Sequence, residues 1–300
     1  MIVYPKINLG LKVLRKRPDG YHDLETLFVP CTAFHDELHI VEAGEFSIDI
    51  DCCDWDPASD LTAAAYRLLA DEFGIPPVHI ELRKGIPVGA GLGGGSSDAA
   101  AALRLISDLY SLGLSDDALA SRAARLGSDC PFFVYGRPMF GEGRGEILSP
   151  FDIDLSAYEM RVELPEGVHV STREAYSGLK IAPVATVSHH CASGSVDTAL
   201  SGSGHCDASL VTSGFGLREA LRRPVAEWRD CLVNDFETTV FAVHPEIAAL
   251  KARFYAEGAE YASMSGSGSA VFGLWRVPGG DIMKYNALNN NRIRDCLSVK

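Results

Sequence analysis

Apolar and polar positions alternate in two short segments of the first hundred residues. Residues 46–51 (FSIDID) and 79–83 (HIELR) show the two-residue period of strands with one buried face. Between them, residues 61–73 (LTAAAYRLLADEF) carry apolar side chains at helical spacing, with Asp60 before the first turn and Gly74 after the last. Aspartate is a favoured N-cap, and glycine readily adopts the left-handed conformation that ends a helix. The pattern predicts a strand, a helix and a second strand.

Two more helices are predicted in this half of the chain. The first covers residues 97–112, with Asp98 in its first turn and Gly113 as its stop. The second covers residues 115–126, with a serine cap at its start and Gly127 at its end. Strands and helices are therefore mixed in the first half.

The pattern changes around residues 150–165, which we interpret as a crossover into a second unit. We predict one domain of residues 1–155 and another of residues 156–300. Helical patterns and then a strand pattern follow at residues 217–221, 245–257 and 270–275. The fold class predicted is α+β, with two lobes.

Residues 181–216 differ from the rest of the chain because they contain no lysine or arginine and are rich in serine and glycine. Such a stretch buries little apolar surface, so we predict a flexible insertion. It carries zinc-ligand residue types, but their spacing matches no closed structural site, and a flexible loop is the favoured interpretation. These residues are His189, His190, Cys191, His205 and Cys206.

Composition narrows the classes of partner. The chain has 300 residues and a formal net charge of −13, which argues against nucleic-acid binding. No apolar run is long enough to span a membrane, and the first residues, MIVYPKINLG, lack the pattern of a signal peptide. The eight cysteines form no CxxC pair, as expected of reduced thiols. We expect a cytoplasmic protein with a small-molecule partner.

The strongest local signal is a glycine-rich segment that leads directly into a helix. Residues 87–97 read PVGAGLGGGSS, with five glycines between positions 89 and 95. Glycines let the backbone approach a ligand closely, and the free amides of the following helix favour an anion. Two serine hydroxyls add donors. The segment predicts a phosphate site made of Pro87, Gly89, Ala90, Gly91, Leu92, Gly93, Gly94, Gly95, Ser96 and Ser97.

Other glycine-rich loops fit this segment less well. A dinucleotide fingerprint would follow a uniformly apolar strand, and an acidic residue would end the next strand about 20 residues on. A P-loop would end in Gly-Lys-Ser/Thr, and a protein kinase would contain HRD and DFG elements. None of these features is found in the sequence. A nicotinamide-dependent oxidoreductase is therefore disfavoured.

The glycine-rich segment resembles the phosphate-binding motif of the GHMP kinases. Residues 5–9 (PKINL) and 264–270 (MSGSGSA) resemble the N-terminal and C-terminal motifs of the same family, in the same order. The resemblance implies an N-terminal lobe like ribosomal protein S5 domain 2 and a ferredoxin-like C-terminal lobe. It also implies that ATP binds in the cleft between the lobes, together with Mg²⁺, and that a small-molecule hydroxyl is phosphorylated.

Residues 17–24 (RPDGYHDL) and 126–133 (LGSDCPFF) are similar to segments of the diphosphocytidyl-methylerythritol kinase branch of this family. This similarity implies that the partner is 4-diphosphocytidyl-2-C-methyl-D-erythritol. It implies that Lys6 and Asp129 are catalytic, with Asp129 accepting the proton of the attacking hydroxyl. The implied substrate-binding residues are Asn8, Tyr21, His22 and Tyr176. No residue is assigned to a metal.

Each of these residues also has an ordinary structural role open to it. Asp129 could cap a loop, Lys6 could be a surface lysine, and Tyr176 could be a core residue on an amphipathic helix. Two other functions stay open, namely a GHMP kinase for homoserine, mevalonate or a sugar, and an inactive nucleotide-binding regulator. The DGYH segment disfavours the first, and the presence of Lys6 and Asp129 disfavours the second.

Overall fold

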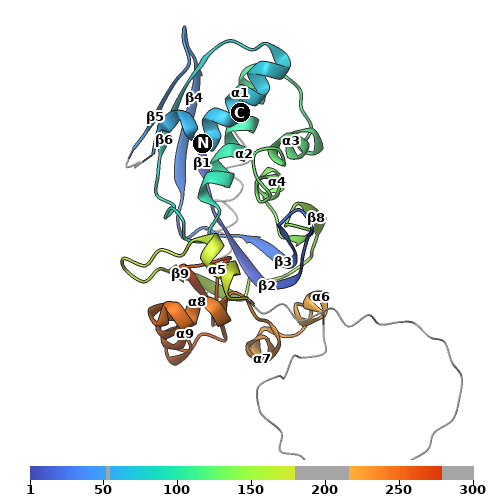
Figure 1. Ribbon diagram of the computed structural model, residues 1–300, viewed down its shortest axis with the longest axis vertical. Helices are drawn as coiled ribbons and strands as arrows, with labels where there is room; N and C mark the ends of the chain where they lie inside the picture. The colour runs from blue at the N-terminus through green and yellow to red at the C-terminus, as the bar shows by residue number, and fades with distance from the viewer. Residues whose placement is uncertain (52–54, 180–215, 279–300) are drawn as a thin grey trace, which may run out of the picture.

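The computed structural model describes residues 1–51, 55–179 and 216–278, which form two lobes (Figure 1). The described part confirms the predicted α+β class, with strands and helices mixed in both halves of the chain. The insertion predicted at 181–216 lies outside the described residues except for Gly216, and so do its histidines and cysteines. The proposed domain boundary at residue 155 falls between strand β8 (Ile147–Pro150) and strand β9 (Tyr158–Glu163) and stays a prediction.

A four-stranded sheet forms the outer part of the N-terminal lobe. Its order is β1 (Ile2–Val3), β4 (Asp36–Glu42), β6 (Val78–Arg83) and β5 (Ser47–Ile50). Strand β5 runs parallel to β6, which requires the crossover made by the short 3₁₀ helix η1 (Pro57–Ser59) and helix α1 (Leu61–Phe73). Both strands and the helix between them confirm the predicted order.

Two helices pack on this sheet and two more pack against the second of them, around a shared apolar core (Figure 1). They are α1, α2 (Gly94–Leu109), α3 (Asp116–Ala123) and α4 (Cys130–Tyr135). The prediction began α2 at residue 97, three residues too late, because glycines are poor helix formers and were assigned to the loop. The prediction also missed α4, which has only six residues.

A second sheet joins the two lobes. Its order is β2 (Lys6–Lys16), β3 (His22–Pro30), β7 (Met139–Glu142) and β8, and every neighbouring pair is antiparallel. The pairing of β2 with β3 shifts register at Gly10, which has a φ of 71°. A Cβ at Gly10 would lie 2.6 Å from side-chain carbons of Leu217 and Leu232, so glycine lets the C-terminal lobe pack against this strand.

The C-terminal lobe is a three-stranded antiparallel sheet covered by helices. The sheet order is β10 (Tyr261–Met264), β11 (Val271–Arg276) and β9. The helical segments are α5 (Thr172–Ser177), α6 (Leu217–Ala220), η2 (Val225–Glu227), α7 (Trp228–Cys231), α8 (Glu237–Val243) and α9 (Pro245–Ala256). The predictions for residues 217–221, 245–257 and 270–275 are confirmed to within one residue at each end.

Backbone hydrogen bonds fasten the C-terminal lobe to strand β2. The amide of Leu11 donates to the carbonyl of Val233 at 2.9 Å. The carbonyl of Leu11 accepts from the amide of Asp235, also at 2.9 Å. The Asp235 carboxylate accepts from the amide of Val13 at 2.7 Å. The strand that begins at Lys6 is therefore held from both lobes.

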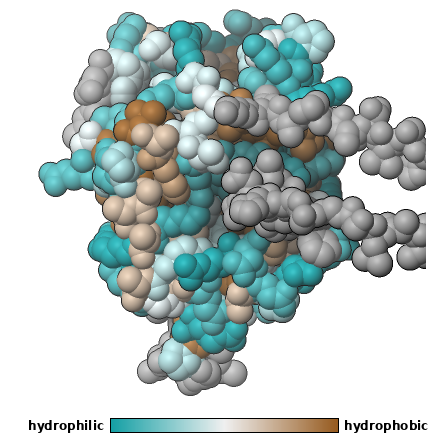
Figure 2. Space-filling model, turned by 60° about the horizontal axis from the view of Figure 1, so that its bottom comes forward, coloured by the Kyte–Doolittle hydropathy of each residue, from teal (hydrophilic) through white to brown (hydrophobic). Residues whose placement is uncertain are grey.

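The outward face of the C-terminal lobe is mostly hydrophilic where it is described, with hydrophobic residues gathered in narrow patches (Figure 2). Across the described ranges, every helix is too short or too polar to cross a bilayer.

Candidate active site

The glycine-rich loop leaves β6 and enters α2. Gly89, Gly91 and Gly93 all have positive φ values, between 70° and 76°. At Gly91 a Cβ would lie only 2.1 Å from the carbonyl oxygen of Ser265, so this glycine lets the loop touch the second glycine-rich turn at residues 265–269. The two glycine-rich motifs of the sequence are therefore packed against each other.

A cavity of about 270 Å³ lies beside this loop. The first turn of α2 borders it, and a Cβ at Gly89 would meet no atom within 4 Å. A phosphate chain is bound well by free helix amides, an unobstructed backbone and a serine hydroxyl. These residues therefore fit the nucleotide implied by the sequence. The predicted residues that line this cavity are Pro87, Gly89, Ala90, Gly91, Gly93, Gly94, Gly95 and Ser96.

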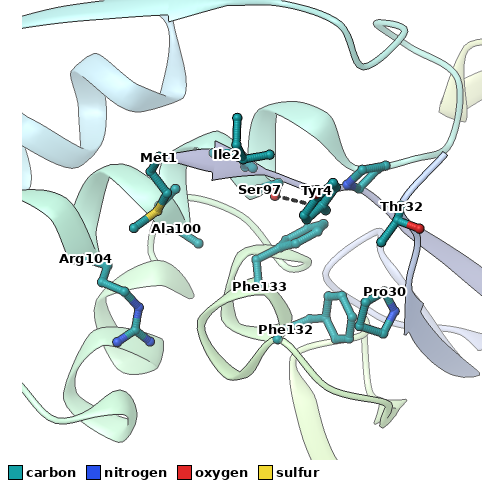
Figure 3. A pocket seen from close by; sticks show the side chains of 14 residues that line it. Met1, Ile2, Tyr4, Pro30, Thr32, Ser97, Ala100, Arg104, Phe132 and Phe133 are labelled. Atoms are coloured by element: carbon teal, nitrogen blue, oxygen red, sulfur yellow. Dashed lines mark hydrogen bonds between the residues drawn. The ribbon is translucent and has the colours of Figure 1, made fainter. Parts of the chain in front are cut away.

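Two of the predicted loop residues, Leu92 and Ser97, have side chains that face away from this cavity. Leu92 is buried in the core beneath the loop. Ser97 donates its hydroxyl to the carbonyl of Tyr4 at 2.7 Å and lines a separate cavity of about 90 Å³ on the far side of α2 (Figure 3). Gly94 lines the cavity, and a Cβ there would lie 2.9 Å from the side chain of Ile86, which lines the same cavity. Ser97 therefore anchors the helix to the N-terminal strand through its hydroxyl.

A larger cavity of about 470 Å³ lies between the lobes. Both lobes contribute to its wall, since Lys6, Asp129 and Arg144 line it together with Tyr176 and Ser267. It shares three lining residues with the first cavity, namely Gly89, Gly91 and Gly93. A group bound beside the loop in one cavity would therefore lie next to a molecule bound in the other.

Lys6 and Asp129 meet at this junction. Nζ of Lys6 lies 3.5 Å from Oδ2 of Asp129, and the lysine side chain is 4% exposed whereas the aspartate is 34% exposed. Asp129 occupies the N-cap position of α4, but its carboxylate makes no capping hydrogen bond with that helix. The carboxylate is thus available to the cavity, which is the position that a proton acceptor needs.

The ammonium of Lys6 is held by groups from three segments. It donates to Oδ1 of Asn8 at 2.5 Å and to the carbonyl of Gly91 at 3.0 Å, in addition to its ion pair with Asp129. Burial lowers the pKa of Lys6 from 10.5, and the carboxylate of Asp129 opposes that shift. The lysine is therefore fixed at the contact between the glycine-rich loop and Asp129.

Asn8 belongs to a buried network behind Lys6. Its amide nitrogen donates to the hydroxyl of Thr26 at 3.0 Å, and its backbone amide donates to the hydroxyl of Ser265 at 3.2 Å. From the C-terminal lobe, Asn234 donates to the carbonyls of Met264 and Gly266, both at 2.8 Å. Asn8 lines the larger cavity and also orients Lys6, so the structure gives it a positioning contact beyond the predicted substrate contact.

Of the three predicted aromatic residues, Tyr176 lines the larger cavity, and His22 and Tyr21 each contact a residue that lines it. His22 stacks on Tyr176, with ring centroids 4.4 Å apart, and Tyr176 also packs edge-on against Phe236. Tyr21 is 55% exposed, and the guanidinium of Arg144 lies 4.8 Å from the centre of its ring. Strand β3 and helix α5 therefore bring together residues that are far apart in sequence.

Comparison with known proteins decides between the families that share such loops. Residues 60–137 match the GHMP kinases N-terminal domain and residues 217–276 match the GHMP kinases C-terminal domain. A protein from Bacteroides thetaiotaomicron named 4-diphosphocytidyl-2-C-methyl-D-erythritol kinase is 42% identical over 287 residues, covering 93% of each chain. The chain belongs to the GHMP kinase family.

Solved structures agree with this assignment. A 4-(cytidine 5'-diphospho)-2C-methyl-D-erythritol kinase superposes with a TM-score of 0.68 at 30% identity, covering 98% of this chain and 95% of that chain. A Leishmania major mevalonate kinase superposes with a TM-score of 0.56 at 16% identity, covering 94% of this chain and 91% of that chain, which shows a shared fold alone. The two-lobed fold predicted from the sequence is confirmed, and the protein is a small-molecule kinase.

Lys84 and Trp55 are among the residues of this kinase's loop cavity that the sequence analysis missed. Lys84 precedes the loop, and Trp55 donates its indole N–H to Oδ2 of Asp60 at 3.3 Å. The other carboxylate oxygen of Asp60 caps α1 by accepting from the amide of Thr62 at 2.8 Å. No sequence pattern indicates Trp55, whereas Lys84 stands three residues before a predicted phosphate loop and could have been considered.

Proposed function

We propose that this kinase transfers the γ-phosphate of ATP to the 2-hydroxyl of 4-diphosphocytidyl-2-C-methyl-D-erythritol. The observation that supports the reaction most strongly is the junction of the two cavities at Gly89, Gly91 and Gly93, with Lys6 and Asp129 beside it. The choice of acceptor is supported by the named relatives, which match along nearly the whole chain.

ATP, when bound, supplies the phosphoryl group, and the cavity beside the loop would hold its phosphates. The amides of the first turn of α2 and the hydroxyl of Ser96 would bind phosphate oxygens. Trp55 and Asp60 line the far part of this cavity, where the nucleoside would lie. The glycines between the two cavities would let phosphate and acceptor approach without side-chain obstruction.

At the junction, Asp129 would accept the proton of the attacking hydroxyl while Lys6 stabilises negative charge on the transferred group. Phosphoryl transfer relies mainly on positioning and on charge stabilisation, and a lysine fixed by three partners provides both. The lowered pKa of Lys6 reflects burial, and the Asp129 carboxylate counteracts it, which helps the ammonium to keep its charge. Each residue therefore depends on the other.

Mg²⁺ would neutralise charge on the phosphates. Proteins usually bind this ion through one or two carboxylates together with the nucleotide. Within the described ranges, no group of three or more histidine, cysteine, aspartate or glutamate side chains could hold a metal ion. The carboxylate of Asp129 is assigned to the proton of the attacking hydroxyl, so the ion would be held mainly by the nucleotide phosphates. The cytoplasmic location expected from the sequence stays a prediction.

The acceptor would occupy the larger cavity with its cytidine end near His22 and Tyr176. Aromatic faces are the usual surfaces on which proteins stack nucleobases. Tyr21, with its ring more than half exposed, and Arg144 would border the same end. Asn8, beside Lys6, would lie near the reacting end of the acceptor.

The proposal is tested by measuring ADP release from ATP with a panel of acceptors. The diphosphocytidyl alcohol should be phosphorylated, whereas mevalonate, homoserine and galactose should give only background release. Turnover of one of the last three, without turnover of the first, would show that the fold serves a different GHMP kinase reaction. Absence of turnover with every acceptor, in a folded protein that binds ADP, would favour a nucleotide-binding regulator.

A further inference from the structure

A buried carboxylate at the start of β4 holds the segment that leads into the glycine-rich loop. Asp36 is fully buried, and its Oδ1 accepts hydrogen bonds from the amides of Gly85 and Ile86 at 2.6 and 2.7 Å. Its Oδ2 accepts from Nζ of Lys84 at 2.5 Å. A Cβ at Gly85 would lie 2.3 Å from the carbonyl oxygen of His35, so glycine is needed for this close approach.

The same lysine also reaches the far end of the loop. Nζ of Lys84 donates to Oδ2 of Asp98, in the first half of α2, at 2.6 Å. The loop lies between these two residues in the sequence, leaving residues 84–86 and entering α2 at Gly94. Asp36, Lys84 and Asp98 therefore link both ends of the loop to the start of β4.

Three ionisable side chains are buried together in this group. Two carboxylates share one ammonium, and all three side chains are at most 8% exposed. In the described part of the chain, Oδ1 of Asp98 is the one buried side-chain nitrogen or oxygen atom that has no hydrogen-bond partner. Burial raises the pKa of Asp98 to about 8, so one proton balances the charge near neutral pH, but burying ionisable groups still costs stability. A well-packed apolar group would serve a purely structural purpose at least as well. The arrangement therefore points to a role beyond stability.

We propose that Asp36, Lys84 and Asp98 form a brace that holds the two ends of the glycine-rich loop at the spacing required for binding nucleotide phosphates. Lys84 is the positioning residue at its centre. The inference rests on the proposed placement of ATP beside the loop. The ammonium makes the brace strong because a hydrogen bond with an ionised partner is about twice as strong as a neutral hydrogen bond. The brace acts through the loop backbone, so it should affect nucleotide affinity and leave the acceptor end unchanged.

The first test compares Asp98→Asn with the wild-type protein by calorimetric titration of ADP and of the diphosphocytidyl alcohol. The amide keeps the size of the side chain but weakens the bond to Lys84. We expect the dissociation constant for ADP to rise on the order of tenfold to a hundredfold, the scale of a small misplacement of a binding group. The dissociation constant for the acceptor should change less than twofold.

A matched control is Asp116→Asn. Like Asp98, Asp116 lies near the start of a helix and pairs with a cation, Arg104, at 2.8 Å, but on the surface of the protein. This variant should bind ADP as the wild type does. Wild-type ADP affinity in a folded Asp98→Asn protein would overturn the brace.

A second pair of variants separates positioning from stability. Lys84→Met leaves two buried carboxylates without their cation and should lower both the melting temperature and ADP affinity. Lys84→Met combined with Asp98→Asn removes one of the two acidic groups and should recover much of the melting temperature. The brace predicts that ADP affinity stays low in the double variant, because the two loop ends are still not linked.

Recovery of ADP affinity together with stability would show that the group is merely structural, and would overturn the inference. A wild-type protein that binds no nucleotide would overturn both this inference and the proposed function. A wild type that binds ADP, with variants that bind it equally well, would overturn only the brace.

Discussion

The imidazole of His22 lies parallel to the phenol ring of Tyr176, with an angle of 17° between the ring planes. Strand β3 contributes the first ring and helix α5 the second, so this stack is a contact between the two lobes. Burial and the nearby Lys16 lower the pKa of His22, which favours a neutral ring at neutral pH. A neutral ring pair at the end of the larger cavity is suited to stacking with a nucleobase.

Replacing Tyr176 by alanine should weaken binding of the diphosphocytidyl alcohol. We expect a loss of about 1–3 kcal/mol, the scale of one base–aromatic stack. Tyr176→Phe keeps the ring and should bind the acceptor nearly as well as the wild type. The measurement is calorimetric titration of the acceptor and, separately, of ADP, whose affinity should not change. Equal acceptor affinity in the alanine and phenylalanine variants would contradict a stacking role.

The glycines of the loop should respond differently to substitution. At Gly95 a Cβ would lie 3.8 Å from the Leu61 side chain, an ordinary contact at the edge of the loop cavity. Gly95→Val should therefore fold and weaken ADP binding by about tenfold, because it narrows the cavity. The comparison variant is Gly94→Ala, whose Cβ would press on Ile86, and it should lose about 1–3 kcal/mol of stability.

Titration calorimetry with ADP and thermal unfolding of both variants distinguish these effects. If Gly95→Val bound ADP with wild-type affinity, the nucleotide would not lie where the loop cavity places it. If Gly94→Ala were as stable as the wild type, the contact with Ile86 would be looser than the structure shows.

Features encoded within one segment could be predicted from the sequence. Helix α1 begins after Asp60 and ends before Gly74, as predicted, because both caps belong to the segment itself. The glycine-rich loop was found because five closely spaced glycines directly before a helix are typical of a backbone that approaches an anion. Motif order identified Lys6 and Asp129, and the structure places them 3.5 Å apart.

Contacts between distant segments could not be predicted in this way. Lys84 and Asp36 are 48 residues apart, and nothing near either one in the sequence indicates that they form an ion pair. The stack of His22 on Tyr176 depends on how the C-terminal lobe packs against strand β2. The hydroxyl of Ser97 was assigned to the phosphate site because it follows Ser96, but the helix turns it toward Tyr4.

The stability of the protein should depend on pH through Asp98. Burial raises the pKa of Asp98 from 3.8 to about 8. Between these values the folded protein holds a proton that the unfolded chain has released, so the free energy of unfolding should fall as pH rises from about 4 to about 8 and level off above. One such group contributes a slope of up to about 1.4 kcal/mol per pH unit.

Asp98→Asn cannot take up this proton and should show a shallower slope over that pH range. Urea unfolding at pH 5, 6, 7 and 8 measures the dependence of the unfolding free energy on pH in Asp98→Asn and in the wild type. Asp116→Asn is the control. Identical slopes in Asp98→Asn and the wild type would mean that the aspartate titrates near its ordinary pKa in the folded state.

The most direct test of the proposed catalytic pair is the kinetics of Asp129→Asn, measured beside Lys6→Ala and the double variant. The amide keeps the size of Asp129 but lacks the basic oxygen, so kcat should fall by about 10²–10⁴, the scale of losing a general base. Dissociation constants for ADP and the acceptor, titrated separately, should change far less. Lys6→Ala should lose a similar factor, and the double variant little more, because each residue acts through the other. A folded Asp129→Asn protein with near-normal kcat would contradict the general-base role and place the chemistry elsewhere in the cleft.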